Sequence, residues 1–506
     1  MRGKGLVWLF HFSLIWLTVL SFSISTLWAQ ETVELKIDWS KREAQSPAAA
    51  TLQVVVNPRL ERGEPPHNAA FQAVKTLGAD YVRYVPWYPY PRRAVAELAQ
   101  PTNESTSWDF SLIDPMAVDF FDATEGHSRI VDFSTIPEWM FVTKNPVVIP
   151  QDPNEPVWDY QQGTQLRDSS LSELSQYYAR LAAWFCRGGF IDELGRQHYS
   201  GHYFTLPYWE VLNEAESEHS ETPKQYTERY DAIVTGIRQS VPEMKFIGMA
   251  LSHPKGQAQF FEYFLNSANH KPGIPIDMIS YHFYAHPTPD QSVQVQIYTF
   301  FEQAEHYLDE VQYIEAIRQR LAPNTRTAID ELGSITPGDG PHKVTPAIPE
   351  SYWNLSAAFF AYMYGRLSEL GIEVIGESQL LGYPTQYPSV TMVDWNTGKP
   401  NARYWALKLI HDNFSPADHL VKAEPGTPYV YVMGALSPDG RRKLLIVNKR
   451  DREFDLILPD VRSFDIETVD EDNGSEQPVV STRTGSHIRL KALAVSAVIY
   501  RQPARP

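Results

Sequence analysis

The sequence predicts an α/β fold, a (β/α)8 TIM barrel followed by a C-terminal antiparallel β-sandwich domain. Eight short strand-like runs alternate with helical segments from Leu52 to Gly376. Helical spacing disappears after about Ser415, where short strands follow one another with only turns between them. The chain has 506 residues, of which 43% are hydrophobic, so it is long enough and apolar enough for two packed domains.

The barrel begins with a complete strand-helix-strand unit. Leu52–Val56 is a strand, Ala69–Leu77 has helical spacing and ends at Gly78, a favourable C-cap, and Tyr81–Val85 is the second strand. Thr222 is the predicted N-cap of another helix, Lys224–Gln239. The other six strands are predicted at Arg129–Phe133, Tyr208–Leu212, Phe246–Met249, Met278–Tyr281, Thr327–Ile329 and Val374–Gly376.

The sandwich is predicted from short apolar runs near the end of the chain, at Tyr429–Val432, Lys443–Val447, Phe454–Leu458 and Val495–Ile499. An alternating run at Val33–Ile37 is expected to join it, and the polar stretch Ser40–Ala50 is interpreted as a linker. The predicted organisation is a signal peptide (1–29), an N-terminal strand joining the sandwich (30–45), the barrel (46–414) and the sandwich (415–506).

The chain ends and the charge restrict where this protein works and what it binds. Arg2 and Lys4 precede an apolar stretch, Leu6–Trp28, which indicates a signal for secretion or export to a periplasm; an uncleaved membrane anchor is the alternative. The net charge is -17 and no basic run occurs, which argues against nucleic acid or an anionic membrane as partner. Cys186 is the single cysteine and lies on an apolar helix face, so we interpret it as core filler.

Two predicted strands end on a glutamate. Val211-Leu212-Asn213-Glu214 closes the fourth strand, and Thr327-Ala328-Ile329 runs into Asp330-Glu331 at the end of the seventh. In a parallel barrel these strand ends meet at one mouth. Two carboxyl groups there suit glycosidic bond cleavage, one to protonate the leaving oxygen and one to attack or activate water. The structural alternative is that both are acids in the first turn of a helix, where they favour the helix dipole.

The pentapeptide Ile-Asp-Glu-Leu-Gly provides an internal control because it occurs twice. Glu331 lies in the copy at 329–333, which follows a strand. Glu193 lies in the copy at 191–195, which follows a helix ending at Gly188-Gly189 and runs into polar residues. We therefore expect Glu331 in the mouth and Glu193 on a surface loop.

Aromatic side chains gather near the same predicted mouth. Trp87 follows the second strand and Trp139 follows the third, and both are candidates to stack on sugar faces. Each has an ordinary alternative as a packing residue. Four further polar residues are either substrate contacts or solvated groups, and the sequence leaves both interpretations open: Glu216, Glu218, Glu377 and Gln379.

The Asn-Glu pair on the fourth strand, with a second Glu on the seventh, resembles the large clan A of retaining glycoside hydrolases built on (β/α)8 barrels. The resemblance implies that Glu214 is the general acid/base, Glu331 the nucleophile, and that Asn213 contacts the sugar 2-hydroxyl. It also implies that His282 and Tyr284, in a His-x-Tyr arrangement, and Arg83 on the second strand belong to the substrate-binding site, with Arg83 near the nucleophile. His282 could instead be a core histidine, and Arg83 could point outward into a surface salt bridge.

Within that clan, the N-terminal strand, barrel and sandwich are similar to family-39 type glycosidases, the β-xylosidase and α-iduronidase group. The eighth strand departs from the clan, because Gly376-Glu377-Ser378-Gln379 stands where many members have a Trp. The sequence therefore does not identify the sugar. The resemblance implies an oligo- or polysaccharide or glycoside substrate and no cofactor. An Arg and a Tyr hydroxyl beside Glu331 would keep it ionised, while a more enclosed Glu214 could hold its proton.

A carbohydrate-binding protein on a catalytically inactive barrel is the main alternative. A metal-dependent barrel hydrolase would need closely spaced His ligands, and the chain after the signal has no His-x-His or His-Glu-x-x-His. No Gly-x-Ser-x-Gly or Gly-x-x-x-x-Gly-Lys occurs either, which argues against a serine hydrolase or a P-loop enzyme.

Overall fold

The computed structural model describes residues 32–145, 147–158, 163–340, 348–384 and 386–501. The predicted signal peptide and its apolar stretch lie outside these residues. Among the helices that are described, none has both the length and the apolar character needed to cross a bilayer.

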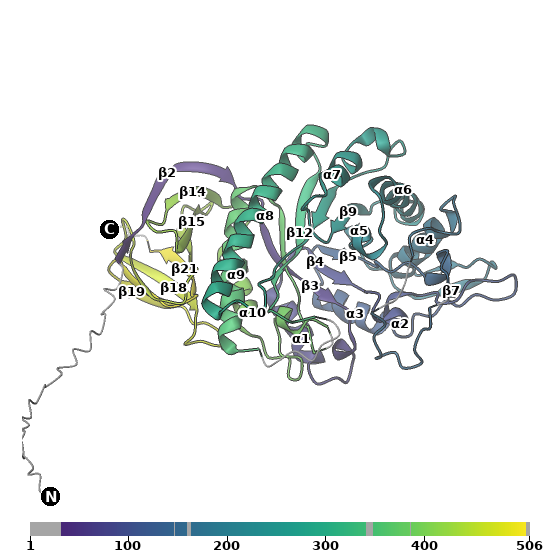
Figure 1. Cartoon of the computed structure of the whole chain (residues 1–506), viewed down its shortest axis with the longest axis horizontal. Helices are drawn as coiled ribbons and strands as arrows, with labels where there is room; N and C mark the ends of the chain where they lie inside the picture. The colour runs from purple at the N-terminus through teal and green to yellow at the C-terminus, as the bar shows by residue number, and fades with distance from the viewer. Residues whose placement is uncertain (1–31, 146, 159–162, 341–347, 385, 502–506) are drawn as a thin grey trace, which may run out of the picture.

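A closed parallel barrel forms the larger half of the molecule (Figure 1). Its strands pair in sequence order, and β10 pairs with β12 while β13 pairs with β3, which closes the ring. The predicted barrel is confirmed. Its strands are β3 (Ala49–Val55), β4 (Val82–Val85), β5 (Arg129–Val131), β8 (Tyr208–Val211), β9 (Lys245–Leu251), β10 (Met278–Tyr281), β12 (Arg326–Ser334) and β13 (Val374–Glu377).

Helices cover the outside of the barrel, and their ends follow local sequence signals. The first helix ends at Gly78, which has φ 64°, and Thr222 caps another through a capping box with Gln225, as the sequence predicts for both ends. The longer helices are α1 (His67–Leu77), α3 (Asp114–Ala123), α4 (Ser172–Cys186), α6 (Pro223–Ser240), α7 (Ala258–Phe264), α8 (Val293–Leu321), α9 (Glu350–Glu369) and α10 (Ala402–Asn413). Cys186 is buried in α4, and burial raises the pKa of its thiol to about 12, so it is unreactive filler.

Short elements occupy the loops between strands and helices. Two of them, α5 and β11, lie next to predicted site residues: α5 begins after Glu214, and β11 begins after His282. They are α2 (Pro91–Ala94), α5 (Ala215–Glu218), the hairpin strands β6 (Gly189–Ile191) and β7 (Gln197–Tyr199), β11 (Phe283–Ala285), and the 3-10 turns η1 (Pro58–Leu60), η2 (Glu138–Met140), η3 (Ser267–Asn269) and η4 (Pro388–Val390).

The second half is a β-sandwich, which lies beyond α8 and α9 in Figure 1. A seven-stranded sheet faces a three-stranded one across a core of its own. The large sheet contains β2 (Lys36–Gln45), β14 (His419–Glu424), β15 (Val430–Leu436), β16 (Arg442–Asn448), β18 (Ser463–Val469), β19 (Ser481–Thr484) and β21 (Val495–Tyr500). The small sheet contains β1 (Thr32–Glu34), β17 (Phe454–Ile457) and β20 (His487–Leu490).

The predicted linker at Ser40–Ala50 is wrong. Strand β2 continues to Gln45 and pairs antiparallel with β14, and β3 begins at Ala49. The polar composition suggested a linker, but it has another cause. Strand β2 lies at the edge of its sheet with most of its side chains exposed, so its residues are polar although its backbone is paired.

The barrel interior is layered along the strands. An apolar cluster closes it near the strand starts, formed by Ile130, Tyr208, Ile247, Met278, Ala328 and Val374. Two residues further along their strands, on the same inward face, lie Asp132, Glu210 and Asp330. A polar layer therefore begins immediately above an apolar plug, and the mouth lies above that layer.

Candidate active site

The fourth barrel strand ends in an irregular turn that presents Glu214. Leu212 and Glu214 both have left-handed backbone conformations, with φ 63° and φ 43°. The Glu214 N–H donates to the Ala250 carbonyl at 2.9 Å, which holds the turn against β9. Non-glycine residues with positive φ cost free energy and occur where the surrounding structure enforces them, often at functional sites. Here they direct the Glu214 side chain toward the barrel mouth.

The seventh strand, β12, contains a register shift against β13 between Ile329 and Leu332. A bulge of this kind turns a side chain away from strict alternation. Asp330 and Glu331, although consecutive, therefore both lie near Arg83: the Glu331 carboxylate accepts from Nη1 at 2.6 Å, and Asp330 Oδ2 lies 3.7 Å from Nε.

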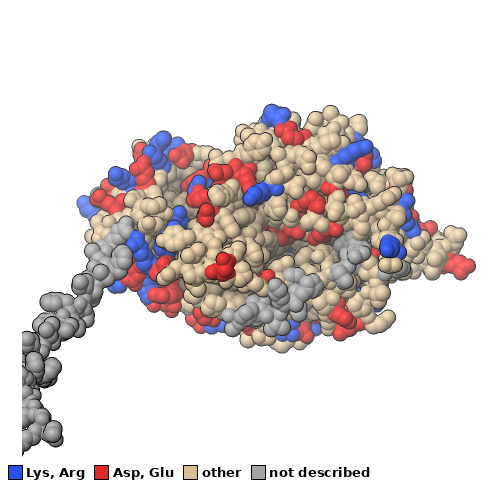
Figure 2. All heavy atoms as spheres, in the orientation of Figure 1, with Lys and Arg blue, Asp and Glu red and all other residues tan. Residues whose placement is uncertain are grey.

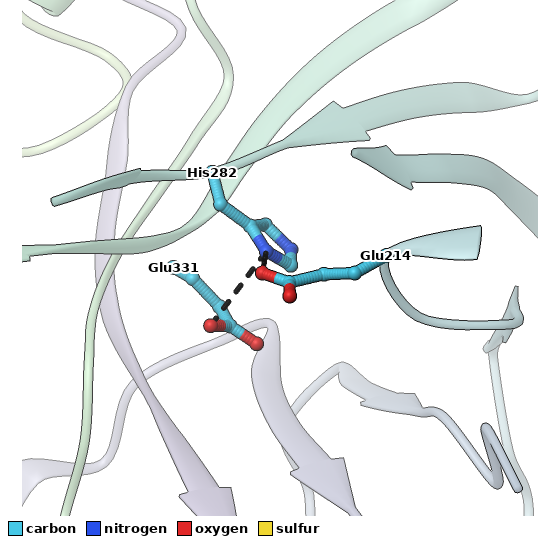
Figure 3. A group of neighbouring side chains, drawn as sticks. All are labelled: Glu214, His282 and Glu331. Carbon is cyan, nitrogen blue, oxygen red and sulfur yellow. Dashed lines mark hydrogen bonds and ion pairs between the residues drawn. The ribbon is translucent and has the colours of Figure 1, made fainter. Parts of the chain in front are cut away.

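Glu214 and Glu331 lie beside each other, with His282 between them (Figure 3). One carboxylate oxygen of each glutamate and a ring nitrogen of His282 are all within 4.8 Å of one another. Carboxyl groups are about 5–5.5 Å apart in retaining glycosidases and about 6.5–9.5 Å apart in inverting ones. The short distance between the Glu214 and Glu331 carboxylate oxygens agrees with the separation found in retaining enzymes. Within the described part of the chain, no other group of three or more His, Cys, Asp or Glu side chains gathers this closely.

Glu331 is held as a carboxylate by three neighbours. Tyr284 Oη donates to it at 2.7 Å, Arg83 Nη1 donates at 2.6 Å, and His282 Nδ1 lies 3.6 Å away. Burial would raise the pKa of Glu331, but the charges of His282 and Arg83 and the hydrogen bond from Tyr284 outweigh burial and lower it. An ionised, partly desolvated carboxylate results.

Arg83 does not point outward; its side chain is fully buried under the mouth. Each of its N–H groups has an acceptor, which leaves none to donate to a ligand. The acceptors are Glu210 for Nε, Gln53 and Glu331 for Nη1, and Asp132 and Asn213 for Nη2. Burial raises the pKa values of Asp132 and Asp330 well above the ordinary range of a carboxyl group. Arg83 is thus held in place by side chains from several barrel strands, Glu331 among them.

His282 is buried, and its Nδ1 bonds Glu214 Oε1 at 2.9 Å. Burial alone would lower the pKa of His282, but the nearby carboxylates of Glu331 and Glu214 outweigh it and raise the pKa to about 9. At neutral pH the imidazole is thus protonated and donates to Glu214.

The expectation that Glu214 is more enclosed than Glu331 is wrong. The side chain of Glu214 is 22% exposed and that of Glu331 is 11% exposed. The reason is position: Glu214 lies past the end of β8 at the edge of the cavity, whereas Glu331 lies within β12 against Arg83.

A cavity of about 490 Å³ opens above the two glutamates. Figure 2 shows a hollow on the barrel half of the molecule with acidic side chains gathered in it. Asn213, Glu214, Tyr284, Glu331 and Trp87 line the cavity. The other lining residues are Gln53, Val55, Val85, Tyr88, Trp158, Ser217, Glu218, Ser252, Ile335, Gln379, Gln386, Tyr387 and Val390.

Among the predicted site residues, Arg83 and His282 are buried and do not line the cavity, and Trp139 does not line it either. Its indole N–H donates to the Glu97 carbonyl at 2.9 Å, and the Arg167 guanidinium lies 4.6 Å from its ring centre. Its position after a strand was the basis of the prediction, but η2 turns the ring toward a neighbouring loop instead. Glu377 is likewise not at the mouth, because it is buried in an ion pair with Arg403.

Three polar or aromatic residues of the cavity wall were not predicted as site residues from the sequence. Gln53 lies within the first strand, where an isolated polar residue in an apolar run was the available signal. Trp158 comes from the loop 145–169, and nothing local distinguishes it from other loop aromatics. Glu218 was left undecided between a substrate contact and a solvated acid, and the structure puts it in the cavity wall.

Comparison with known proteins identifies the fold. No protein-family model and no curated protein matches the sequence. Among solved structures, a glucosidase from Croceicoccus marinus is 13% identical, with 94% of this chain and 100% of that chain covered and a TM-score of 0.61. The GH51 arabinofuranosidase from Xanthomonas axonopodis pv. citri is 11% identical, with coverage of 93% and 100% and a TM-score of 0.63.

A GH30 endoxylanase from Clostridium papyrosolvens C71 is 12% identical, with coverage of 93% and 99% and a TM-score of 0.54. At these identities the likeness concerns the fold. This chain therefore has the two-domain fold, barrel with attached β-sandwich, found in these glycosidases.

Proposed function

We propose that this protein is a retaining glycoside hydrolase that cleaves O-glycosidic bonds by double displacement. The observation that carries the proposal is the close approach, within 4.8 Å, of carboxylate oxygens of Glu214 and Glu331 in the wall of one cavity. The shared fold with glycosidases raises the expectation of this chemistry without assigning it.

In the first step the Glu331 carboxylate attacks the anomeric carbon and the bond to the leaving oxygen breaks. The lowered pKa of Glu331 keeps it available as a nucleophile at neutral pH. The departing oxygen takes a proton from Glu214. The His282–Glu214 hydrogen bond supplies that proton, so His282 becomes neutral as the glycosyl-enzyme forms.

In the second step Glu214 removes a proton from water, which attacks the anomeric carbon and releases Glu331. The proton returns to the His282–Glu214 pair, and the enzyme regains its starting state. Asn213 binds the sugar 2-hydroxyl in this scheme. Its Oδ1 accepts a hydrogen bond from Arg83 Nη2 at 2.8 Å, which holds the side chain in place. Arg83 and Tyr284 hold Glu331 in place and act on the substrate only through it.

The substrate class is a glycoside, oligosaccharide or polysaccharide. Placement beside the family-39 type glycosidases rests on the two glutamates and on the architecture alone. Export from the cell, indicated by the N-terminal sequence, is part of the same proposal because a polysaccharide is met outside the cell.

The test is a panel of 4-nitrophenyl α- and β-glycosides of arabinofuranose, glucose and xylose, followed by proton NMR of the first product on the best substrate. Retention of the anomeric configuration is expected, and inversion would contradict the proposed roles. Glu214→Ala should lose activity on substrates with poor leaving groups and regain turnover with added azide, with a glycosyl azide as product.

A carbohydrate-binding protein on an inactive barrel predicts a different result. The folded wild type would bind sugars without cleaving any member of the panel, and Glu331→Gln would leave binding unchanged.

A further inference from the structure

A third carboxyl group lies in the cavity wall beside the two proposed catalytic glutamates. Glu218 ends α5, four residues after Glu214 and so one helical turn along the chain, on the same side. It lines the cavity together with Glu214 and Glu331. The double displacement proposed above uses two carboxyls, so the presence of a third requires its own explanation.

One oxygen of Glu218 is fixed and the other is available. Trp87 Nε1 donates to Oε1 at 2.7 Å, and Asn213 Nδ2 donates to the same atom at 3.0 Å. Within the described part of the chain, no donor reaches Oε2. The carboxyl plane is thus held by an aromatic ring and by the amide of Asn213, which itself is anchored to Arg83.

Glu218 carries a proton at neutral pH. Burial and the charge of Glu214 raise its pKa to about 8, and the hydrogen bonds from Trp87 and Asn213 only partly offset them. The titratable groups around it are also acidic: Glu331, Asp132 and Tyr88. Because Oε1 already accepts two N–H donors, the proton belongs on Oε2, where it can be donated to a ligand oxygen.

We propose that Glu218 contacts the substrate and determines its specificity. Its Oε2 binds a sugar oxygen beside the one that Asn213 binds, and Glu218 thereby selects uncharged sugars over uronic acids. This inference rests on the proposed function and names the substrate class of the same site.

Selection against uronic acids follows from what the cavity offers a carboxylate. Of the described residues that line it, three are glutamates and none is Lys, Arg or His. The two buried cations beside the glutamates are already engaged. Arg83 donates every N–H group, and His282 bonds Glu214 through Nδ1 while its Nε2 lies 3.6 Å from Asp330 Oδ1. A sugar carboxylate would therefore be desolvated without a partner, next to like charge, which is unfavourable.

The first test compares the pH dependence of kcat/KM for wild type and Glu218→Gln on the best neutral 4-nitrophenyl glycoside. Gln keeps an oxygen for Trp87 and Asn213 and presents N–H donors that do not titrate. We expect wild-type activity to fall above pH 8, as Oε2 loses its proton, and the fall to move to about pH 9 in the variant, where His282 titrates.

Glu216→Gln is the matched control on the same short helix. Its carboxyl bonds Ser252 at 2.6 Å and does not line the cavity, so its alkaline limb should match wild type. An unchanged limb in Glu218→Gln would overturn the proposal. A folded but inactive Glu218→Gln would overturn it too, because the proton would then be transferred rather than shared.

The second test needs no variant. Glucose or xylose and glucuronate are titrated into wild type at pH 7 while the fluorescence of the cavity tryptophans is followed. Neutral sugars should bind at least about tenfold more tightly than glucuronate, and equal or tighter binding of glucuronate would overturn the proposal. Because this readout is binding, it holds even if no glycoside is cleaved, in which case the hydrolase assignment fails by itself.

Discussion

The two copies of Ile-Asp-Glu-Leu-Gly place the same side chains in opposite environments. At 191–195 the peptide forms the turn between β6 and β7, where Glu193 is 25% exposed and bonds Trp108 and Arg180. At 329–333 it lies inside β12, where Glu331 faces the cavity. The pentapeptide itself does not determine which glutamate can react.

The aspartates differ even more than the glutamates. In the turn, burial would raise the pKa of Asp192, but hydrogen bonds from His198, Arg196 N and Thr106 lower it. In the strand, Asp330 accepts no hydrogen bond in the described structure, and burial raises its pKa. In a turn, backbone N–H groups have no strand partner and can donate to a carboxylate. In a strand, the backbone N–H groups already donate to carbonyl oxygens of neighbouring strands.

The largest expected difference between the two copies is in catalysis. Glu331→Gln removes the proposed nucleophile and should lower kcat by about 10⁴-fold or more on the best glycoside. Glu193→Gln changes the same atoms in the same pentapeptide and should stay within about twofold, because it alters only a partly exposed ion pair. Initial rates on one substrate measure both, and comparable losses would show that Glu331 has no special role.

The two histidines nearest these copies give a second comparison. His282 is proposed to supply the proton of Glu214, while His198 bonds Asp192 at 3.1 Å in the turn. His282→Gln should lower kcat/KM by about 10²-fold, and His198→Gln should leave it near wild type.

The pH profile separates the proton role of His282 from a packing role. Its pKa is raised to about 9, so the proton is present below that pH and lost above it. In the Glu218→Gln background, the remaining alkaline limb near pH 9 should disappear when His282 is also replaced. Persistence of that limb would assign it to another group.

The smallest expected effect is on stability. Asp192→Asn should lower the free energy of unfolding at pH 7 by about 1–3 kcal/mol, because the ionised, hydrogen-bonded carboxylate is lost. Asp330→Asn replaces a carboxyl that accepts no hydrogen bond in the described structure and whose pKa burial raises, so it should cost less than about 1 kcal/mol. Urea unfolding midpoints compare the two.

The sign of the pH dependence follows from the shifts. The pKa of Asp192 is lowered from 3.8 on folding, so its stabilisation is present above that value and is lost as the pH falls. The difference between Asp192→Asn and wild type should therefore shrink toward pH 3. A difference independent of pH would contradict the charged state of Asp192.

Much of the fold could be predicted because it depends on local patterns. The barrel strands are apolar runs, and Gly78 and Thr222 end or begin helices through their own backbone and side-chain chemistry. The edge strand β2 was missed because pairing with β14, 370 or more residues away, leaves no apolar pattern. Trp139 was misplaced because a strand end predicts the mouth, while the following turn decides where the ring points.

The sequence by itself determined which strands end on carboxyl groups, and a parallel barrel brings such ends together, so Glu214 and Glu331 could be named in advance. Only the tertiary structure decided the ionisation of Glu331 and His282, because pKa depends on neighbouring groups, and the neighbours of Glu331, such as Arg83 and Tyr284, are distant in sequence. It also decided that Glu218 faces the cavity with one oxygen held by Trp87 and Asn213. Burial and charge are properties of the assembled site, and no single segment carries them.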